Sequence, residues 1–387
     1  MKSDKNILII NSSPDNFQPI FNLLLELDII DFSFSLFWSG KKEWFNKKFK
    51  EKKWLEKKIY LGPPIGNSFY FLFFIITLPL NYLLSFIYIL PYKYFKKIDT
   101  IICLGINEKI IFTPLAKILK IKVLWLENSD FYLPNFYPPK KLLFLYKIYS
   151  RLVHIISFTK LTEEKLINIG IKKANIRLIP LGTKLNQYNH QENIFSKIAR
   201  TEILKFNHKF FTIGTITELN KDQNIEILFR AIKTCLAIIP NMQIIIVGEG
   251  EERKNLAWLA KKMVIDNIVW FVGKQSYLKK WLDSFDIFVS TNKFFNLDDL
   301  ETILKVMASK IPIIGPSKAG LEYVINNSAN NLSEFLIAFN NSDELAGKII
   351  KLFKDKNLRQ KLGQINNINV EKNFNMAKQA EEFKKIL

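Results

Sequence analysis

Short apolar runs alternate with longer amphipathic stretches along this chain, and this alternation constrains the fold more than any other feature of the sequence. In the first part of the chain, strand patterns occur at residues 5–13, 100–104, 122–126, 154–158 and 176–180. Helical patterns lie between some of them, as at residues 107–119 and 160–169. Strands that alternate with helices form parallel sheets through βαβ crossovers. The pattern therefore predicts an α/β fold.

A second alternating series begins at Phe210. Strand patterns occur at residues 211–216, 242–247, 268–272, 286–290 and 311–315, and helical patterns at residues 224–239, 251–263, 275–283 and 300–308. The 387 residues suit two domains at a prior of ~150 residues each. We predict a Rossmann-like N-terminal domain (residues 1–183), a polar linker (184–208), a second Rossmann-like domain (209–370) and a terminal helix (371–387) placed to return to the first domain.

Residues 41–95 interrupt the first series and are predicted to form an insert. Residues 41–58 hold nine lysines and three glutamates with interspersed aromatic side chains, and residues 69–90 are almost wholly apolar. The apolar stretch is long enough to span a bilayer, but Pro79 and Asn81 near its middle and basic flanks on both sides argue against a crossing. We expect a helix in the membrane plane with lysines on anionic headgroups. The alternative is a helix buried between the sheet and neighbouring helices.

The charge balance is the other unusual feature, with 56 Lys+Arg against 36 Asp+Glu and a net charge of +20. Such an excess indicates an anionic partner, namely nucleic acid, anionic lipid or a phosphorylated substrate. A genome rich in A and T, which favours Lys, Asn, Ile and Phe codons, would also explain part of it. The apolar stretch beside the lysines fits lipid better than nucleic acid, so we expect an anionic membrane surface and no nucleic acid as partner.

Several chemistries lack their sequence signals. Cys103 and Cys235 lie far apart in apolar runs, which excludes a disulfide framework and indicates a reducing, cytoplasmic compartment. No His/Cys cluster has metal-ligand spacing. The nucleophile elbow of hydrolases and the P-loop of NTPases are both absent. What remains is a nucleotide-fold signal, in which Gly248-Glu249-Gly250 ends a strand and precedes a helix.

The second half of the chain resembles the C-terminal domain of GT-B glycosyltransferases, specifically those of the retaining family 4 type. The order and spacing of several segments carry the resemblance: residues 213–221, 246–252, 270–273, 285–290, 307–314 and 358–363, followed by Phe374. It covers about residues 210–387 well and the first half more loosely. The resemblance implies two Rossmann-like domains that face each other across a cleft.

The resemblance also implies an activity, which is transfer of a sugar from a nucleotide-diphosphate donor to an acceptor with retention of configuration, without a metal or other cofactor. The expected donor-binding residues are Gly214, Thr215, Lys221, Gly248, Gly250, Gly273, Lys274, Asp298, Asp299, Leu300 and Glu301. The sequence departs from the family pattern at four positions. Thr215 and Gln223 stand where a basic pair is usual, and Leu297 and Lys305 stand where a Glu-x7-Glu element is usual. Glu301 and Lys305 are spaced to form a surface ion pair instead.

In the first domain, Glu127 and Asp130 follow a predicted strand at the position where the family often places a catalytic or acceptor-orienting histidine. We predict a catalytic role for these two carboxylates, and a role as turn or capping residues is the alternative. The apolar insert favours a glycan or lipid-linked acceptor and a peripheral position on the inner face of the cell membrane. A different class of function is also open, namely a catalytically degenerate relative that acts as a membrane-associated binding or scaffold protein.

Overall fold

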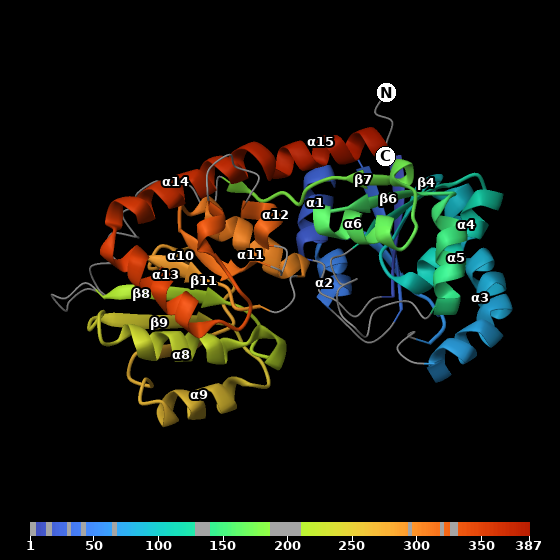
Figure 1. Ribbon diagram of the computed structural model, residues 1–387. Helices are drawn as coiled ribbons and strands as arrows, with labels where there is room; N and C mark the ends of the chain where they lie inside the picture. The colour runs from blue at the N-terminus through green and yellow to red at the C-terminus, as the bar shows by residue number, and fades with distance from the viewer. Residues whose placement is uncertain are drawn as a thin grey trace. The chain divides into compact units, whose positions relative to one another are not determined.

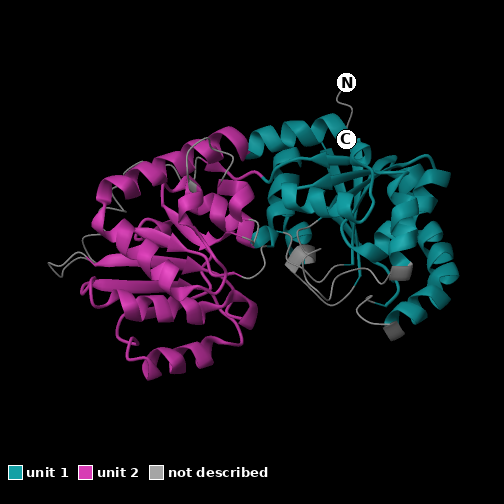
Figure 2. Ribbon diagram, viewed as in Figure 1, with its two compact units in different colours: residues 1–181, 296–298, 376–387 teal, residues 182–295, 299–375 magenta. Residues whose placement is uncertain are grey.

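The computed structural model describes residues 5–12, 18–28, 32–39, 44–63, 68–127, 140–185, 210–292, 296–317, 321–325 and 332–387. The chain divides into two compact units, shown in Figure 2. Unit 1 comprises residues 1–181, 296–298 and 376–387, and unit 2 comprises residues 182–295 and 299–375.

Unit 1 is built on a parallel sheet in the order β3-β2-β1-β4-β5-β6-β7, counted over the described residues. Its strands are β1 (Lys5–Asn11), β2 (Phe32–Trp38), β3 (Leu55–Lys58), β4 (Ile98–Cys103), β5 (Lys122–Glu127), β6 (His154–Ser157) and β7 (Ile176–Leu178). Every neighbouring pair of these strands is parallel. The central strands read as nearly continuous apolar runs because helices cover both faces of a parallel sheet.

The helices of unit 1 are α1 (Gln18–Asp28), α2 (Trp44–Glu51), α3 (Ser68–Phe95), α4 (Ile106–Ile118), α5 (Lys140–Ser150), α6 (Lys160–Asn168) and α15 (Met376–Ile386). Helices α3, α4 and α5 lie side by side (Figure 1), and a buried cluster that includes Phe37, Trp125 and Leu142 fills the core beside them. Helix α15 packs on α1, and Lys122 on β5 donates a hydrogen bond to the Ile386 carbonyl at its end. The last residues of the chain thus belong to unit 1.

Residues 41–95, predicted as an insert, are an integral part of the sheet domain. Their strand β3 pairs with β2 at the edge of the sheet, and their helix α3 packs against β4 and α4. Phe49 and Trp54, expected within a headgroup-facing stretch, instead join an aromatic cluster with Phe21 and Phe34. Strand β3 has the sequence Leu-Glu-Lys-Lys, and a charged edge strand of this kind protects a sheet from further pairing.

Unit 2 holds a parallel sheet in the order β10-β9-β8-β11-β12-β13, again counted over the described residues. Its strands are β8 (Phe211–Ile216), β9 (Met242–Val247), β10 (Val269–Gly273), β11 (Ile287–Val289), β12 (Ile313–Pro316) and β13 (Leu336–Ile337). Its helices are α8 (Ile225–Cys235), α9 (Arg253–Lys262), α10 (Lys279–Leu282), α11 (Leu297–Ala308), α12 (Leu321–Ile325), α13 (Ser342–Lys354) and α14 (Lys356–Asn373).

The prediction of two Rossmann-like halves is confirmed. Strands β8 and β9 have the predicted bounds, and the other strands of the second series begin within two residues of the predicted ones. The predicted helix at residues 275–283 is shorter and reduces to α10.

Buried asparagines attach α14 to unit 2. The side-chain amides of Asn366, Asn367 and Asn369 donate to the carbonyls of Ile311, Ala308 and Val324 at 2.9, 3.0 and 2.7 Å. A buried amide must be hydrogen-bonded to offset its desolvation, so these contacts fix the register of the helix. The last turn of α14 is thereby positioned to lead into α15.

Candidate active site

The strand order of unit 2 locates its candidate site. From β8 the chain builds β9 and β10 on one side and then β11, β12 and β13 on the other. The loops after β8 and β11 therefore diverge at the carboxyl edge of the sheet, which is where open α/β sheets bind ligands. The described part of this edge comprises residues 217–224, 248–250, 274 and 290–292.

Two glycines let the loop after β9 lie directly on the loop after β8. A Cβ atom at Gly248 would lie 1.8 Å from the Thr217 carbonyl oxygen, and one at Gly250 would lie 2.2 Å from the Leu219 carbonyl oxygen. Only glycine fits such a close backbone approach. The Leu219 N–H donates to the Glu249 carbonyl at 3.0 Å, and the Gly248 N–H donates to the Gly273 carbonyl at 3.0 Å. We call residues 217–219 and 248–250 together the backbone shelf.

A buried cluster of neutral polar side chains joins the loops after β8 and β11. The Thr217 hydroxyl donates to Gln223 Oε1 at 2.5 Å, and the Thr291 hydroxyl donates to the Gln223 carbonyl at 2.5 Å. All three residues are buried. Gln223 stands where the family resemblance implies a lysine, so a hydrogen-bonded amide takes the place of a cation at this point.

The charged residues predicted to bind the donor lie on three separate segments. Lys221 lies in the 3-10 turn Lys221–Gln223 and Lys274 follows β10, and both are exposed. Asp298 and Asp299 are half-buried in the first turn of α11, where Leu300 is buried. The predicted ion pair between Glu301 and Lys305 forms, with Nζ and Oε1 3.1 Å apart, but it is largely buried and does not lie on the surface as expected. Within the described residues, no group of three or more His, Cys, Asp or Glu side chains could hold a metal ion.

Gly214 and Thr215 lie inside β8 rather than in the loop that follows it. A Cβ atom at Gly214 would lie 2.1 Å from the Phe285 ring, so close packing in the core explains this glycine. Thr215 is buried on the same strand. Among the predicted donor residues, the structure thus places Gly248, Gly250 and Gly273 together at the sheet edge, and Gly214 and Thr215 below it.

In unit 1, one helical turn gathers the carboxyl ends of several strands. Asn107, Glu108 and Lys109 in the first turn of α4 are all buried, and each side chain reaches a different segment. The Asn107 amide donates to the Leu61 and Pro63 carbonyls at 2.9 and 3.0 Å. This turn lies after β4 and beside β1, at the topological switch point of the sheet.

Glu108 accepts hydrogen bonds from the loop after β1. The Ser12 N–H donates to Glu108 Oε1 at 3.0 Å, the Ser12 hydroxyl donates to Oε2, and the Gly105 N–H donates to Oε1. Burial raises the pKa of Glu108, and these hydrogen bonds oppose the shift without cancelling it. A carboxyl whose pKa is raised in the folded state favours folding when it is protonated.

The raised pKa of Glu108 predicts how stability depends on pH. The stabilising contribution is complete below the unfolded pKa of about 4.3 and is lost as the pH rises through the folded pKa. Glu108→Gln keeps an acceptor for the two N–H groups and should remove this loss. We expect the melting temperature of Glu108→Gln, relative to the parent, to rise between pH 4 and pH 8. Melting temperatures of Glu108→Gln and the parent that change in parallel with pH would contradict the raised pKa of Glu108. The control is Glu251→Gln at an exposed position.

Glu127, predicted as a catalytic residue, ends β5 in a buried ion pair. Lys109 Nζ lies 2.7 Å from Glu127 Oε1, and the two side chains are 4% and 2% exposed. The Tyr146 hydroxyl donates to the same Oε1 at 2.5 Å, and burial together with the Glu127 carboxylate raises the pKa of this tyrosine. The contacts favour a structural role for Glu127. Asp130 lies outside the described residues.

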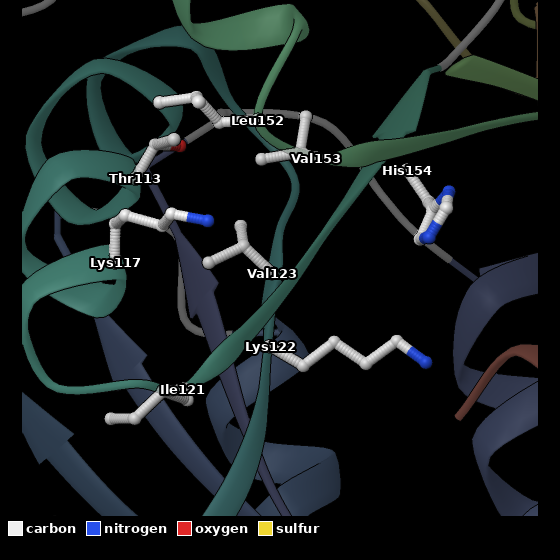
Figure 3. Close-up of a pocket in the computed structure, with 8 residues that line it drawn as sticks. All are labelled: Thr113, Lys117, Ile121, Lys122, Val123, Leu152, Val153 and His154. Carbon is white, nitrogen blue, oxygen red and sulfur yellow. The ribbon is translucent and has the colours of Figure 1, made fainter. Parts of the chain in front are cut away.

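A pocket in unit 1 lies at the amino ends of the strands, opposite to the carboxyl ends where the polar turn of α4 lies (Figure 3). It opens where β5 and β6 begin and α4 ends, with a volume of about 190 Å³. Its lining residues are Thr113, Lys117, Ile121, Lys122, Val123, Leu152, Val153 and His154. Small-molecule sites usually measure ~300–1,000 Å³ and lie at the carboxyl ends of parallel strands. The pocket therefore does not extend the candidate site.

Sequence reasoning missed the polar turn of α4 and the bridging role of Thr291. The signal for the first was present, because Asn107, Glu108 and Lys109 are three consecutive polar residues at the start of the helix predicted at residues 107–119. Their burial was not readable, because the partners Leu61, Ser12 and Glu127 lie far away in the sequence.

Comparison with known proteins finds a family match in the second half of the chain. Residues 197–367 match the family Glycosyl transferases group 1. An uncharacterized glycosyltransferase of Methanocaldococcus jannaschii is 26% identical over 209 residues, which are 52% of this chain and 50% of that protein. The lipopolysaccharide core biosynthesis glycosyltransferase LpsE of Rhizobium meliloti is 25% identical over 136 residues, which are 35% of this chain and 38% of LpsE. The chain thus matches about half or less of the length of these relatives.

Solved structures match over nearly the whole chain. A glycosyltransferase from Rickettsia africae has a TM-score of 0.81 at 15% identity and covers 99% of this chain and 98% of its own. HepE of Anabaena, solved in complex with UDP and glucose, has a TM-score of 0.75 at 15% identity and covers 98% of both chains. At this identity the likeness establishes the fold, which is GT-B. The family match thus covers residues 197–367, and the fold match covers nearly the whole chain.

Proposed function

We propose that this protein transfers a sugar from a nucleotide-diphosphate donor to an acceptor, with retention of configuration, in the manner of retaining family 4 enzymes. The observation that carries the proposal is the backbone shelf. Two glycines there bring the loops after β8 and β9 into direct backbone contact at the edge where α/β sheets bind ligands. The shelf lies within residues 197–367, which match the glycosyltransferase family.

The chemistry of the site suits a departing diphosphate. Negative charge grows on the leaving phosphate in the transition state, and fixed dipoles or cations at that point lower the barrier. Lys221 and Lys274 follow β8 and β10 and are exposed. In this proposal they are the cations that contact the diphosphate, because Gln223 is neutral and Lys305 is paired with Glu301.

The acceptor is proposed to be a glycan or a lipid-linked saccharide of the cell envelope. LpsE of Rhizobium meliloti, which resembles this chain, is named for lipopolysaccharide core biosynthesis. The apolar surface of α3 also favours a substrate held at a membrane. We propose a peripheral position on the cytoplasmic face, where nucleotide sugars would be available.

A second function, a membrane-associated binding or scaffold protein without catalysis, is favoured by specific contacts. The Gln223 side chain accepts a hydrogen bond from Thr217, and the Glu301 carboxylate is held by Lys305. Both positions would carry or adjoin charged donor-binding groups in the active family. A protein that had lost catalysis would be free to replace those groups.

Calorimetric titration with UDP, GDP and their sugars tests the two functions. We expect saturable binding of one nucleotide series, weakened about tenfold or more in Lys221→Ala, because charged hydrogen bonds contribute about 1.5–3 kcal/mol. Lys356→Ala, an exposed lysine at the start of α14, is the matched control. Absence of heat with every nucleotide would favour the scaffold. A donor-library screen by mass shift then identifies the sugar, and the anomeric configuration of the product tests retention.

A further inference from the structure

Helix α3 is almost wholly apolar, yet unit 1 covers only one side of it. No charged residue occurs between residues 68 and 92, and by length and composition residues 70–95 could cross a membrane. Phe74 and Ile89 are fully buried against unit 1. The opposite side is exposed: Leu72, Ile76, Leu80, Leu83 and Ile87 retain between 53% and 66% of their accessible surface. We call these five residues the α3 face.

The polarity of α3 is reversed relative to that of a helix on a water-soluble surface. Its polar residues Asn81 and Ser85 are fully buried, on the same side as Phe74 and Ile89. Asn81 Oδ1 and Ser85 Oγ have no hydrogen-bond partner within the described residues. A surface helix normally turns its polar residues outward and its apolar stripe inward. The outward stripe of α3 therefore suits an apolar surrounding.

Helix α5, close to α3, also carries exposed apolar side chains. The Tyr82 hydroxyl lies 3.3 Å from the Tyr149 hydroxyl, so the two helices are neighbours, as Figure 1 shows. Phe144 and Ile148, one helical turn apart on α5, are 65% and 38% exposed. A row of exposed apolar side chains such as the α3 face is uncommon on monomeric soluble proteins and marks an interaction site.

Cations lie beside α3 and beyond its C-terminal end. Lys57 on β3 has its Nζ 4.6 Å from the centre of the Tyr88 ring, which places this cation beside α3. Lys96 and Lys97 are exposed just beyond the C-terminal end of the helix, where Tyr94 and Phe95 are also exposed. Lysines and aromatic residues next to an apolar surface are the combination that recognises an anionic membrane interface.

We propose that the α3 face docks on an anionic lipid bilayer, with the axis of α3 parallel to the membrane plane. The helix does not cross, because Phe74 and Ile89 are both buried and lie about 22 Å apart along its axis, so most of its length is attached to unit 1. A bilayer is favoured over a protein partner because exposed lysines lie beside α3 and beyond its C-terminal end, and the five residues of the α3 face offer no hydrogen-bonding side chain. This inference goes beyond sugar transfer and does not depend on it.

Co-sedimentation of the full chain with vesicles of phosphatidylcholine and phosphatidylglycerol tests the docking. We expect Ile76→Glu/Leu83→Glu to reduce the bound fraction at least tenfold. Trp258→Glu, at a 63% exposed position on α9 of unit 2, should leave binding unchanged. Deletion of residues 41–95 is not a usable variant, because it removes β3 and part of the core. Unchanged vesicle binding of the double variant overturns the proposal. If its oligomeric state changes while vesicle binding does not, the partner of the α3 face is a second copy of this chain.

A second measurement does not depend on how the double variant folds. Cys103 and Cys235 are buried, so a cysteine introduced at Ile76 can be labelled selectively with an environment-sensitive fluorophore. We expect a blue shift of the Ile76→Cys label on phosphatidylglycerol vesicles and none for Trp258→Cys. The shift should be larger on anionic than on neutral vesicles and should diminish in Lys57→Gln/Lys96→Gln. Equal shifts at both labelled positions, or none at Ile76→Cys, would overturn the docking. Equal shifts on neutral vesicles would overturn the role of the lysines.

Discussion

Replacing Lys109 by methionine is expected to lower the melting temperature of the protein by roughly 10 °C. The substitution leaves the Glu127 carboxylate buried without its cation, and breaking one side of a buried ion pair costs about 3–5 kcal/mol. In a unit of this size each kcal/mol corresponds to about 2–4 °C. Lys109 also donates to the Leu126 carbonyl at 3.0 Å, and the methionine leaves that acceptor unsatisfied as well.

Lys109→Met/Glu127→Leu should recover a large part of that loss. Removing both charges eliminates the desolvation penalty, and buried pairs replaced by apolar residues are often close to neutral in stability. Arg230→Met is the control, because its partner Glu226 forms an exposed i,i+4 pair that contributes less than about 0.5 kcal/mol. Thermal unfolding followed by circular dichroism gives the double-mutant cycle. A double variant no more stable than Lys109→Met would show that the two residues act separately.

Two further variants address the catalytic prediction for Glu127. If Glu127 only supports the sheet edge, Tyr146→Phe and Glu127→Gln should change transfer activity and stability together. If it acts as a base, Glu127→Gln should remove activity while Tyr146→Phe, which deletes one hydrogen bond to the same oxygen, leaves most of it. The comparison is informative because both variants alter the same buried carboxylate contact.

The sequence pattern predicted most strands that are buried on both faces, although it missed β2. Strand β8 is buried over five of its six residues, so its apolar run is continuous and its bounds were readable. Strand β3 was missed because it is a short edge strand with three charged residues among four, and burial does not impose a pattern on an edge. The consequence was the interpretation of residues 41–95 as an insert.

The candidate site was predictable only where backbone geometry imposes a residue type. Gly248 and Gly250 were recognised because a close backbone approach requires glycine, and the structure places both against carbonyl oxygens of the neighbouring loop. The bond from Thr291 to Gln223 joins residues 68 positions apart. Thr291 lies in no periodic pattern or spaced motif, so no local signal reveals that contact.

A single substitution at Gly248 is also expected to disrupt the backbone shelf. Gly248 has φ +151°, a conformation that side chains rarely adopt, and its missing Cβ leaves room for the Thr217 carbonyl. The atoms nearest to a Cβ at Gly248 are backbone atoms of Thr217, so rotation of a side chain cannot relieve the clash of that Cβ with the Thr217 carbonyl. Restoring space requires the loops after β8 and β9 to separate, which breaks the hydrogen bond from Leu219 to Glu249.

Gly248→Ala should therefore abolish nucleotide binding by calorimetry while lowering stability by about 1–3 kcal/mol, the range expected for overpacking. Gly347→Ala is the matched control, because that glycine lies within α13 with open space around its Cβ position. Alanine there should stabilise the helix by up to about 1 kcal/mol and leave nucleotide affinity unchanged. A folded Gly248→Ala that binds nucleotide as tightly as Gly347→Ala would place the donor away from the shelf, because a separation of these loops must alter any ligand seated on them.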